Sequence, residues 1–400
     1  MGVLELLERL QTHIEAWFHH RQSERPESSS RDLPAEAKQA LIEAIANLPP
    51  HPVHCEALAE AIARSLTTRD EPSEARNALV VLSSPVEPFG PILQAVLKHP
   101  PWALYPVAVV DTIAARATQP AAVLAELRQN IDTLPAPVAT PQAEAQTEIA
   151  KIAALEDCEI DPIEIAAIPA LSECFVRCIE GMNGIESVWT TLARDTSRFW
   201  IVGCNQWAWK YLKRTTQIHS YFSNTLQLPA LKGPELQAWL APVQAQLEQI
   251  LPDITIPEWS EESDRQFYDA LAHAANGLAI AAAPIWLESF QLEILSNESN
   301  HDDSVENPSF KIKRNKPSRP RLPELDNSDR YLLYSVLLHG GTNIERLAQG
   351  LGDSVSTVGS QVRQLLRSRV LVLREDNIRV NPPFYPGLKS SLHGHNFLVD

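Results

Sequence analysis

The sequence predicts an α/β protein with helices at its N-terminus and a small domain of three helices and a hairpin at its C-terminus. Between residues 78 and 228, short apolar runs alternate with helical segments, which is the pattern of a parallel sheet covered by helices on both faces. Residues 231–296 then show helical patterns only. A chain of 400 residues is too long for one ordinary core and suits two or three domains.

The composition is typical of a globular cytoplasmic protein. Hydrophobic residues make up 44% of the chain, and a formal charge of -16 argues against a protein that coats nucleic acid or anionic lipid over its whole surface. The longest uncharged run, residues 270–287, is interrupted by His273, Asn276 and Pro284, so we expect a buried helical hairpin and no membrane span. Five cysteines without a Cys-x-x-Cys pair indicate reduced thiols and no metal site.

Helical periodicity also marks the first 70 residues. Residues 1–22 predict an amphipathic helix that docks on this protein or a partner, because the acids on its polar face disfavour an anionic membrane. A Ser/Pro/Arg-rich linker follows, and residues 34–70 predict a further helical segment. Within it, His51 and His54 stand beside Cys55, where Pro52 breaks the helical spacing, so we expect a surface loop rather than a metal site.

The predicted sheet domain spans residues 76–230 and precedes a helical subdomain at 231–296. Its expected strands are Ala78–Ser83, Tyr105–Val110, Glu164–Ile168, Arg198–Gly203 and Thr225–Leu228. The helices expected after it are Leu236–Leu251, Asp264–Asn276 and Ala279–Leu295. Residues 297–321 have the composition of a disordered linker, with acids first and then only basic residues: Lys311, Lys313, Arg314, Lys316, Arg319 and Arg321.

Residues 322–400 predict a winged-helix domain. Ser328 and Ser354 are expected to cap the first and third helices, and Thr342 with Glu345 forms a capping box for the second. Two short apolar runs, 370–373 and 378–380, then predict a hairpin. Helix, helix, helix and a two-stranded wing is the winged-helix order, and each local signal agrees with its neighbours.

The third of these helices is a candidate DNA-binding element. Polar and basic side chains are expected on its outer face, at Ser356, Ser360, Arg363, Gln364 and Arg367. Such side chains suit the major groove, and the basic linker lies just upstream. However, the domain holds about as many acids as bases, whereas DNA readers usually have a basic footprint. Docking on a protein is therefore the competing interpretation.

Residues 78–400 resemble the P-loop ATPases of the AAA+ and STAND type, many of which carry a helical lid and a C-terminal winged helix. Ala78–Ser84 and the loop after it stand where that family has its first strand and phosphate loop. Glu164–Glu173 resembles the Walker B strand, and Arg198–Asn205 resembles the strand that ends in the polar sensor-1 residue, here Asn205. The segment Cys-Asn-Gln-Trp-Ala-Trp also resembles cyanobacterial proteins.

The departures from this family are as informative as the resemblance. A working phosphate loop, G-x-x-x-x-G-K-[ST], needs glycines for amide contacts, Lys for the phosphate charge and Ser/Thr for magnesium. Here Pro91 and Ile92 stand where Lys and Ser/Thr belong, and Pro169 replaces the Walker B acid. The resemblance thus implies a degenerate nucleotide site with no catalytic residue and no cofactor, at Pro85, Gly90, Pro91, Glu173 and Asn205.

The sequence therefore favours a non-catalytic, ATPase-like scaffold or regulator that docks on a protein partner. Because ATPases of this class assemble side by side, the resemblance implies a paralogue with an intact phosphate loop, or a second copy, as that partner. The alternative is a winged-helix DNA-binding regulator. An aromatic cluster, Trp200, Trp207, Trp209 and Tyr211, is expected to pack where strand meets helix or to anchor a protein interface rather than to stack on single-stranded nucleic acid.

Overall fold

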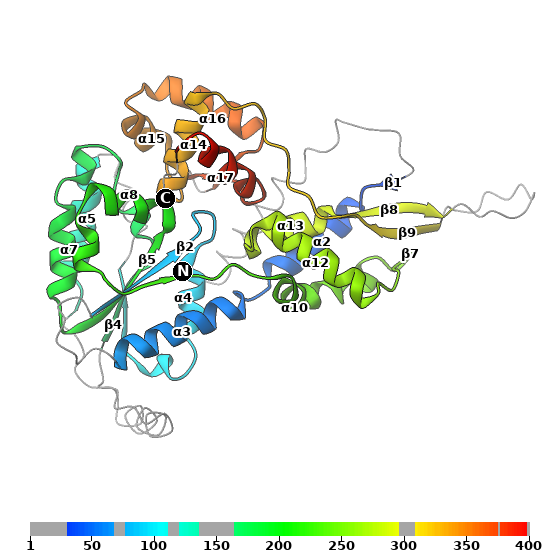
Figure 1. Cartoon of the computed structure of the whole chain (residues 1–400), viewed down its shortest axis with the longest axis horizontal. Coiled ribbons are helices and arrows are strands. Elements are labelled where there is room, and N and C mark those ends of the chain that lie inside the picture. Colours follow the sequence, from blue (N-terminus) through cyan, green and yellow to red (C-terminus); the bar gives the residue numbers. More distant parts are fainter. Residues whose placement is uncertain are drawn as a thin grey trace, which may run out of the picture.

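The computed structural model describes residues 30–67, 77–110, 120–135, 164–295, 309–374 and 377–397. The amphipathic helix predicted at residues 1–22 lies outside them. Figure 1 shows three parts: a sheet domain, an elongated helical part with its own small sheet, and a C-terminal domain packed on the first two. Within the described ranges, no helix is long and apolar enough to cross a membrane.

The sheet domain contains the five predicted strands, all parallel. They are β2 (Ala78–Ser83), β3 (Val107–Val109), β4 (Glu164–Ile168), β5 (Arg198–Asn205) and β6 (Thr225–Gln227). Their order is β3-β4-β5-β2-β6, so the first strand of the domain lies at the centre, beside the fourth and the last. This is the strand order of P-loop ATPases, and the predicted α/β fold class is confirmed.

Helices cover both faces of this sheet. α3 (Pro52–Thr67) and α4 (Phe89–Leu97) pack on one face, and α5 (Pro120–Asp132), α7 (Ile185–Arg194), α8 (Gln206–Thr215) and α9 (Ile218–Tyr221) pack on the other. β5 supplies both cores in alternation, since Trp200 and Val202 face the second set of helices while Phe199 and Ile201 face the first. Burial on both faces explains why these strands are continuous apolar runs in the sequence.

The elongated part is less helical than the sequence predicted. It holds α2 (Ala35–Ala46), α10 (Gly233–Gln244), α11 (Leu247–Ile250), α12 (Glu261–Ala275) and α13 (Ala279–Glu288), together with a sheet of order β1-β8-β9-β7. Its strands are β1 (Ser30–Arg31), β7 (Ile254–Thr255), β8 (Phe290–Leu295) and β9 (Ser309–Arg314). The helix expected to run to Leu295 therefore ends at Glu288, and the segment expected to be a disordered linker contains β9.

A period of two in the apolar residues explains this correction. Phe290, Leu292 and Ile312 are buried against the helices, whereas Glu293 and Lys313 point outward and lie within 3.5 Å of each other. In the antiparallel ladder Leu292 pairs with Ile312 and Phe290 with Arg314. Each strand is too short to stand out beside a long helical pattern, so the alternation was hidden by the preceding alanine-rich helix.

Two of the basic residues of the expected linker, Arg314 and Arg319, bind to other parts of the protein. Arg314 Nη1 lies 2.5 Å from Asp264 Oδ1, and its guanidinium lies over the Trp259 and Phe267 rings at 4.3 and 4.2 Å. Arg319 donates to the carbonyl oxygens that end α12. Residues 309–321 are therefore structured, while residues 297–308 lie outside the described ranges.

The C-terminal domain has the helix–helix–helix–hairpin order that the sequence predicted. Its elements are α14 (Asn327–His339), α15 (Ile344–Leu351), α16 (Val355–Arg367), β10 (Leu371–Arg374), β11 (Asn377–Val380), the turn Pro382–Phe384, and α17 (Tyr385–Gly394), which the sequence did not predict. Ser354 caps α16 as expected. However, Asp326 caps α14 in place of Ser328, and Asn343 caps α15 in place of Thr342. In both cases an Asp or Asn one or two residues away supplies the acceptor oxygen in place of the expected hydroxyl.

Candidate functional site

The carboxyl edge of the parallel sheet brings three loops together. β2 ends at Ser83, β4 ends at Ile168 and β5 ends at Asn205, and the strand register sets Ser83 directly beside Asn205. In open α/β sheets this edge is where ligands bind. The predicted site residues Pro85, Gly90 and Pro91 follow β2, Glu173 follows β4, and Asn205 closes β5. The fold thus assembles the predicted residues around one edge.

The loop after β2 is short and rich in proline. Glu87 N donates to Ser84 O at 3.1 Å, and α4 begins at Phe89. Pro85, Pro88 and Pro91 have no amide hydrogen, so this turn lacks three of the donors that a phosphate loop supplies. The Phe89 ring lies so close to Gly203 of β5 that a Cβ there would clash with it. An aromatic ring therefore fills the space beside the loop.

Asn205 uses its whole side chain within the protein. Oδ1 accepts from the backbone amides of Trp207 and Ala208, both at 2.9 Å, which caps α8. Nδ2 donates to Leu338 O, also at 2.9 Å, and Leu338 belongs to α14 of the C-terminal domain. The side chain is 4% exposed. The sequence offered a ligand-facing role and a capping role for Asn205; the structure gives the cap and a contact between domains.

The end of α14 occupies the middle of this edge. Gly340 has φ of +70°, and a Cβ on it would lie 3.5 Å from Asn205 Nδ2, 3.6 Å from Pro85 O and 3.6 Å from Ser172 Oγ. Gly340 therefore lies close to the loops that follow β2 and β4 and to Asn205 at the end of β5. The positive φ is unfavourable for residues other than glycine, which explains the glycine at this turn.

His339, next to Gly340, is buried against the loop after β4. Its Nδ1 lies 3.2 Å from Ser172 O, so Nδ1 carries the proton and donates to the carbonyl. Its ring meets Phe175 edge-on, with centroids 5.2 Å apart. Burial lowers the pKa of His339 to about 4, since an imidazolium would lose its hydration there. The imidazole is neutral at physiological pH and acts as a packing and hydrogen-bonding group.

Glu173, the nearest acid to the Walker B position, makes an ion pair with the C-terminal hairpin. Its Oε1 lies 3.1 Å from Arg379 Nη2, and both side chains are about one quarter exposed. Arg346 of α15 also approaches the Glu173 carbonyl at 3.5 Å. A carboxylate that neutralises arginine is poorly placed to hold a metal or activate water. No group of His, Cys, Asp or Glu suited to a metal ion occurs among the described residues.

A second seam joins α8 to α17. Trp207 Nε1 donates to Tyr385 Oη at 3.0 Å, and Gln206 Nε2 approaches the same oxygen at 3.4 Å. Trp200, Trp207 and Trp209 are buried, so these three of the predicted aromatic cluster pack inside the protein. The sequence did not single out Tyr385, because its partner Trp207 lies far away in the chain.

Near this seam lies a buried pair, Glu87 and His54. His54 Nδ1 is 3.9 Å from Glu87 Oε1, and its Nε2 donates to Pro229 O at 2.9 Å. Burial raises the pKa of Glu87 to about 7 and lowers the pKa of His54. The expected surface loop at His51 and His54 is wrong, because both rings are buried against backbone carbonyls at Glu235 and Pro229.

The five candidate DNA-binding residues lie together on the exposed face of α16. Ser356, Ser360, Arg363, Gln364 and Arg367 are all exposed. Arg363 Nη2 donates to Ser360 Oγ at 2.9 Å. The opposite face of α16 is buried through Val358, Val362 and Leu365. The structure therefore brings these residues together, at a distance from the sheet edge described above (Figure 1).

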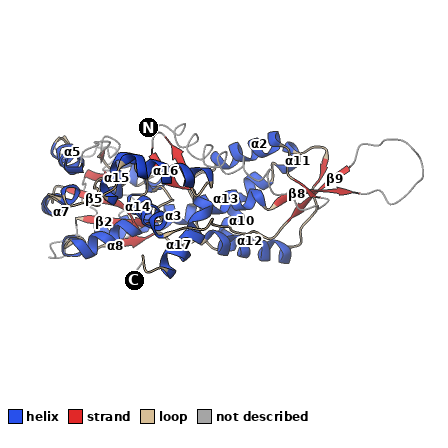
Figure 2. Ribbon diagram, turned by 90° about the horizontal axis from the view of Figure 1, so that it is seen from above, coloured by secondary structure: helices blue, strands red, loops and turns tan. Residues whose placement is uncertain are grey.

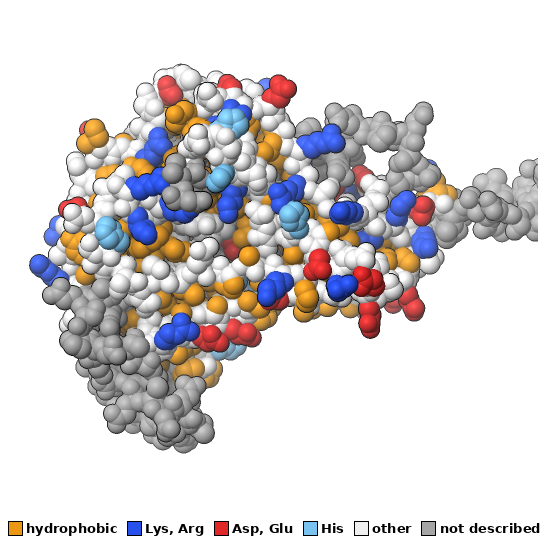
Figure 3. Space-filling view, viewed as in Figure 1, with side chains coloured by type: hydrophobic (Ala, Val, Ile, Leu, Met, Phe, Trp, Pro, Cys, Tyr) orange, Lys and Arg blue, Asp and Glu red, His pale blue; other side chains and the backbone are white. Residues whose placement is uncertain are grey.

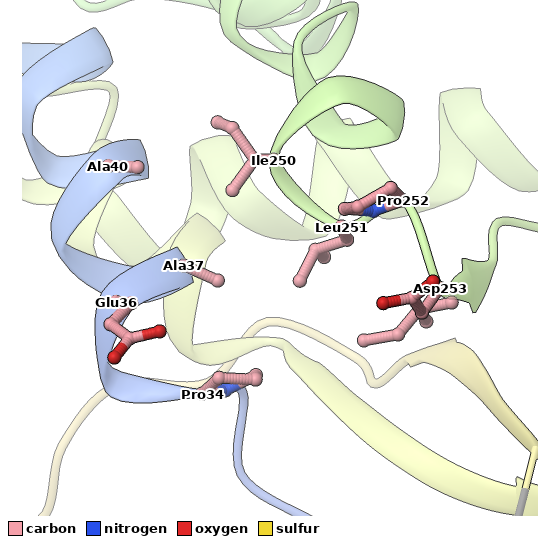
Figure 4. Close-up of a pocket in the computed structure, with 9 residues that line it drawn as sticks. Pro34, Glu36, Ala37, Ala40, Ile250, Leu251, Pro252 and Asp253 are labelled. Atoms are coloured by element: carbon pink, nitrogen blue, oxygen red, sulfur yellow. The ribbon is translucent and has the colours of Figure 1, made fainter.

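One pocket lies in the elongated part (Figure 4). Its volume is about 300 Å³, and it opens between the start of α2 and the turn at Ile250–Ile254. Its lining is mainly apolar and backbone, with Glu36 and Asp253 as the only acids among the lining residues and no base. It carries no group arranged for catalysis.

Neither a family model nor a curated protein matches this sequence. Among solved structures, the ORC2 protein of Aeropyrum pernix is 15% identical, with 87% of this chain and 96% of that chain covered and a TM-score of 0.31. The ORC1 protein of the same organism, solved in complex with DNA, is 11% identical over 93% and 100%, with a TM-score of 0.31. RuvB of Thermotoga maritima is 14% identical over 86% and 96%, with a TM-score of 0.28.

Proposed function

We propose that this protein is a non-catalytic, ATPase-like scaffold or regulator of the cytoplasm whose nucleotide edge has become a contact between its own domains. The observation that carries the proposal is the position of α14. Leu338 accepts from Asn205, and Gly340 lies against the loops after three strands. A nucleotide phosphate at this edge would clash with the end of α14, and Asn205, at the sensor-1 position, would have no hydrogen-bonding group left for it.

The chemistry of the surrounding residues supports the same proposal. The phosphate-loop position lacks its lysine and three amide donors, and its one acid, Glu87, is buried beside His54. Glu173 is paired with Arg379. We infer that the chain neither hydrolyses ATP nor requires a cofactor.

Calorimetric titration with Mg·ATP, followed by phosphate release on the same sample, tests this proposal. We expect no binding below millimolar concentration and no turnover. A variant with a weakened domain contact, Arg379→Glu with Tyr385→Phe, distinguishes a lost site from a covered one, and we expect it to remain silent as well. Micromolar binding by either protein, abolished by Asn205→Ala, would overturn the proposal.

The partner of such a protein would be another protein chain, a P-loop ATPase paralogue or a second copy. β3 supports this inference, because it is the edge strand of the sheet and exposes apolar side chains, with Val109 53% and Val107 39% exposed. Sedimentation of the full chain, alone and mixed with an intact paralogue, measures assembly. We expect Val109→Asp to weaken it, and an assembly unaffected by this change would exclude β3 as the contact.

A DNA-binding regulator is the second candidate function, and the exposed face of α16 favours it. From Ser354 to Arg374 the chain contains four arginines and no acid. Arg363→Ala with Arg367→Ala should weaken binding to a preferred duplex sequence and relax its specificity. Selection from a random duplex library reads this out, and the absence of any enriched sequence would remove base reading from α16.

A further inference from the structure

The strongest unexplained feature of the surface is a set of segments without acids. Acid-free stretches occur at several places in the chain, and three of them, residues 196–234, residues 307–323 and residues 377–397, contribute to this set. The whole chain has 50 acids in 400 residues, so the longest of the acid-free stretches, residues 196–234, stands out against the average frequency of acids. Most of the acid excess falls outside the described residues, and the described ones hold nearly equal numbers of acids and bases.

The fold brings these three segments onto one side of the molecule. The first contains α8 and the third contains α17, and Trp207 of α8 donates to Tyr385 at the start of α17. The second segment contains β9, and its last residues reach α17 at Leu322, since a Cβ on Gly387 would lie 3.5 Å from Leu322 Cδ1. Figure 2 shows α8 and α17 along the same side of the molecule.

This face carries basic side chains that make no ion pair with acids of the described residues. Figure 3 shows Lys and Arg gathered over the region of α8, α17 and the segment after β9, with acidic side chains toward its margins. Lys213, Lys316 and Arg321 are exposed and Lys389 is partly exposed. None of these four makes an ion pair with a residue of the described ranges. Cations left unpaired on three separate segments suggest an external polyanion.

The side chains of this face favour binding of a duplex over binding of a single strand. Binding of single strands relies on exposed aromatic rings, but Trp207 and Trp209 are buried and Tyr211 stacks on Phe175 with an interplanar angle of 4°. An anionic membrane would need an apolar wedge beside the cations, and α17 buries its leucines. Exposed Lys and Arg side chains on separate segments suit contacts with the phosphates of a duplex.

We propose that the face formed by α8, α17 and residues 315–323, defined by Lys213, Lys316, Arg321 and Lys389, binds the phosphate backbone of duplex DNA without reading its sequence. This surface is separate from the exposed residues of α16 and from the closed sheet edge. It does not depend on whether the protein is an ATPase-like scaffold.

Fluorescence anisotropy with a labelled duplex of arbitrary sequence tests the surface on the full chain. If four phosphates are contacted, affinity should fall by about two orders of magnitude between 50 and 200 mM salt, with a log–log slope of about -3.6. Changing all four residues to alanine should abolish most of this slope. The control, Lys98→Ala with Arg128→Ala, removes two exposed cations, at the end of α4 and in α5, and should keep the slope.

The alternatives have distinct results in the same assay. Thermal melting verifies that the four-residue variant still folds, which we expect because its side chains are at the surface. Equal binding by wild type and variant would overturn the proposal, as would tighter binding to a single strand of equal length or to vesicles of anionic lipid. Arg363→Ala with Arg367→Ala should leave the arbitrary-sequence affinity within about twofold, and a larger loss would place the contact on α16.

Discussion

Two substitutions of Asn205 distinguish its role as the N-cap of α8 from its hydrogen bond to α14. Asn205→Ala removes the cap of α8, which costs about 1 kcal/mol. It also removes the donor to Leu338 O and leaves that carbonyl without its partner, which costs about 1–3 kcal/mol. We therefore expect the free energy of unfolding to fall by about 2–4 kcal/mol. Asn205→Ser keeps an N-cap oxygen but is too short to reach α14, so it should recover only about 1 kcal/mol.

Trp207 provides the readout for this experiment. Its indole lies at the contact and donates to Tyr385, so its share of the emission from the chain's nine tryptophans should change when the two domains separate. Denaturant titration followed by Trp fluorescence gives the loss for each variant, and circular dichroism at the same points shows whether helices are lost at once or later. Equal stability of Asn205→Ser and wild type would refute the reasoning, because the bond to Leu338 would then contribute nothing.

Three further predictions concern charged groups around the same contact. Burial raises the pKa of Glu87 from 4.5 to about 7, so the protonated carboxyl contributes to the free energy of unfolding fully below pH 4.5. This contribution, about 3 kcal/mol, is lost as the pH rises to 7. Glu87→Gln should flatten this part of the stability profile, and an unchanged profile would show that the carboxyl is hydrated. The pH dependence of stability has the opposite sign for His339, because its pKa is lowered from 6.5 to about 4. The free energy of unfolding should fall by about 3 kcal/mol as the pH drops from 6.5 to 4. His339→Gln should remove that loss in acid unfolding curves. The partly exposed pair Glu173 and Arg379 should show a coupling of only about 0.5–1 kcal/mol in a double-mutant cycle, and a much larger coupling would mean that the hairpin contact is dry.

The local pattern of apolar and polar residues was sufficient to predict those helices and strands in which the pattern stays the same from end to end. Ala78–Ser83 and Arg198–Asn205 are continuous apolar runs because helices cover both faces of the sheet, and α16 is amphipathic because one face is buried. The sequence did not predict β8, because its alternating pattern begins directly after the buried helix α13 and the apolar residues of the two elements form one continuous run.

The contacts at the sheet edge could not be predicted in this way. The site residues Pro85, Glu173 and Asn205 follow from the resemblance to P-loop ATPases, but their partners Gly340 and Arg379 come from the other end of the chain. No pattern within a window of the sequence carries such a pairing. The buried His54 was missed for the same reason, since its acceptor at Pro229 is distant in sequence.

The direction in which α14 meets the sheet has an electrostatic consequence. Its carboxyl-terminal end, which carries about half a negative charge, lies against the amino-terminal end of α8, which carries about half a positive charge. In a phosphate site that positive helix end would attract the anion. Here a helix end of the same chain satisfies it, and because the two domains are tethered, the effective concentration of this internal counter-charge is at least on the order of millimolar. A free nucleotide would have to compete with a group that can never diffuse away.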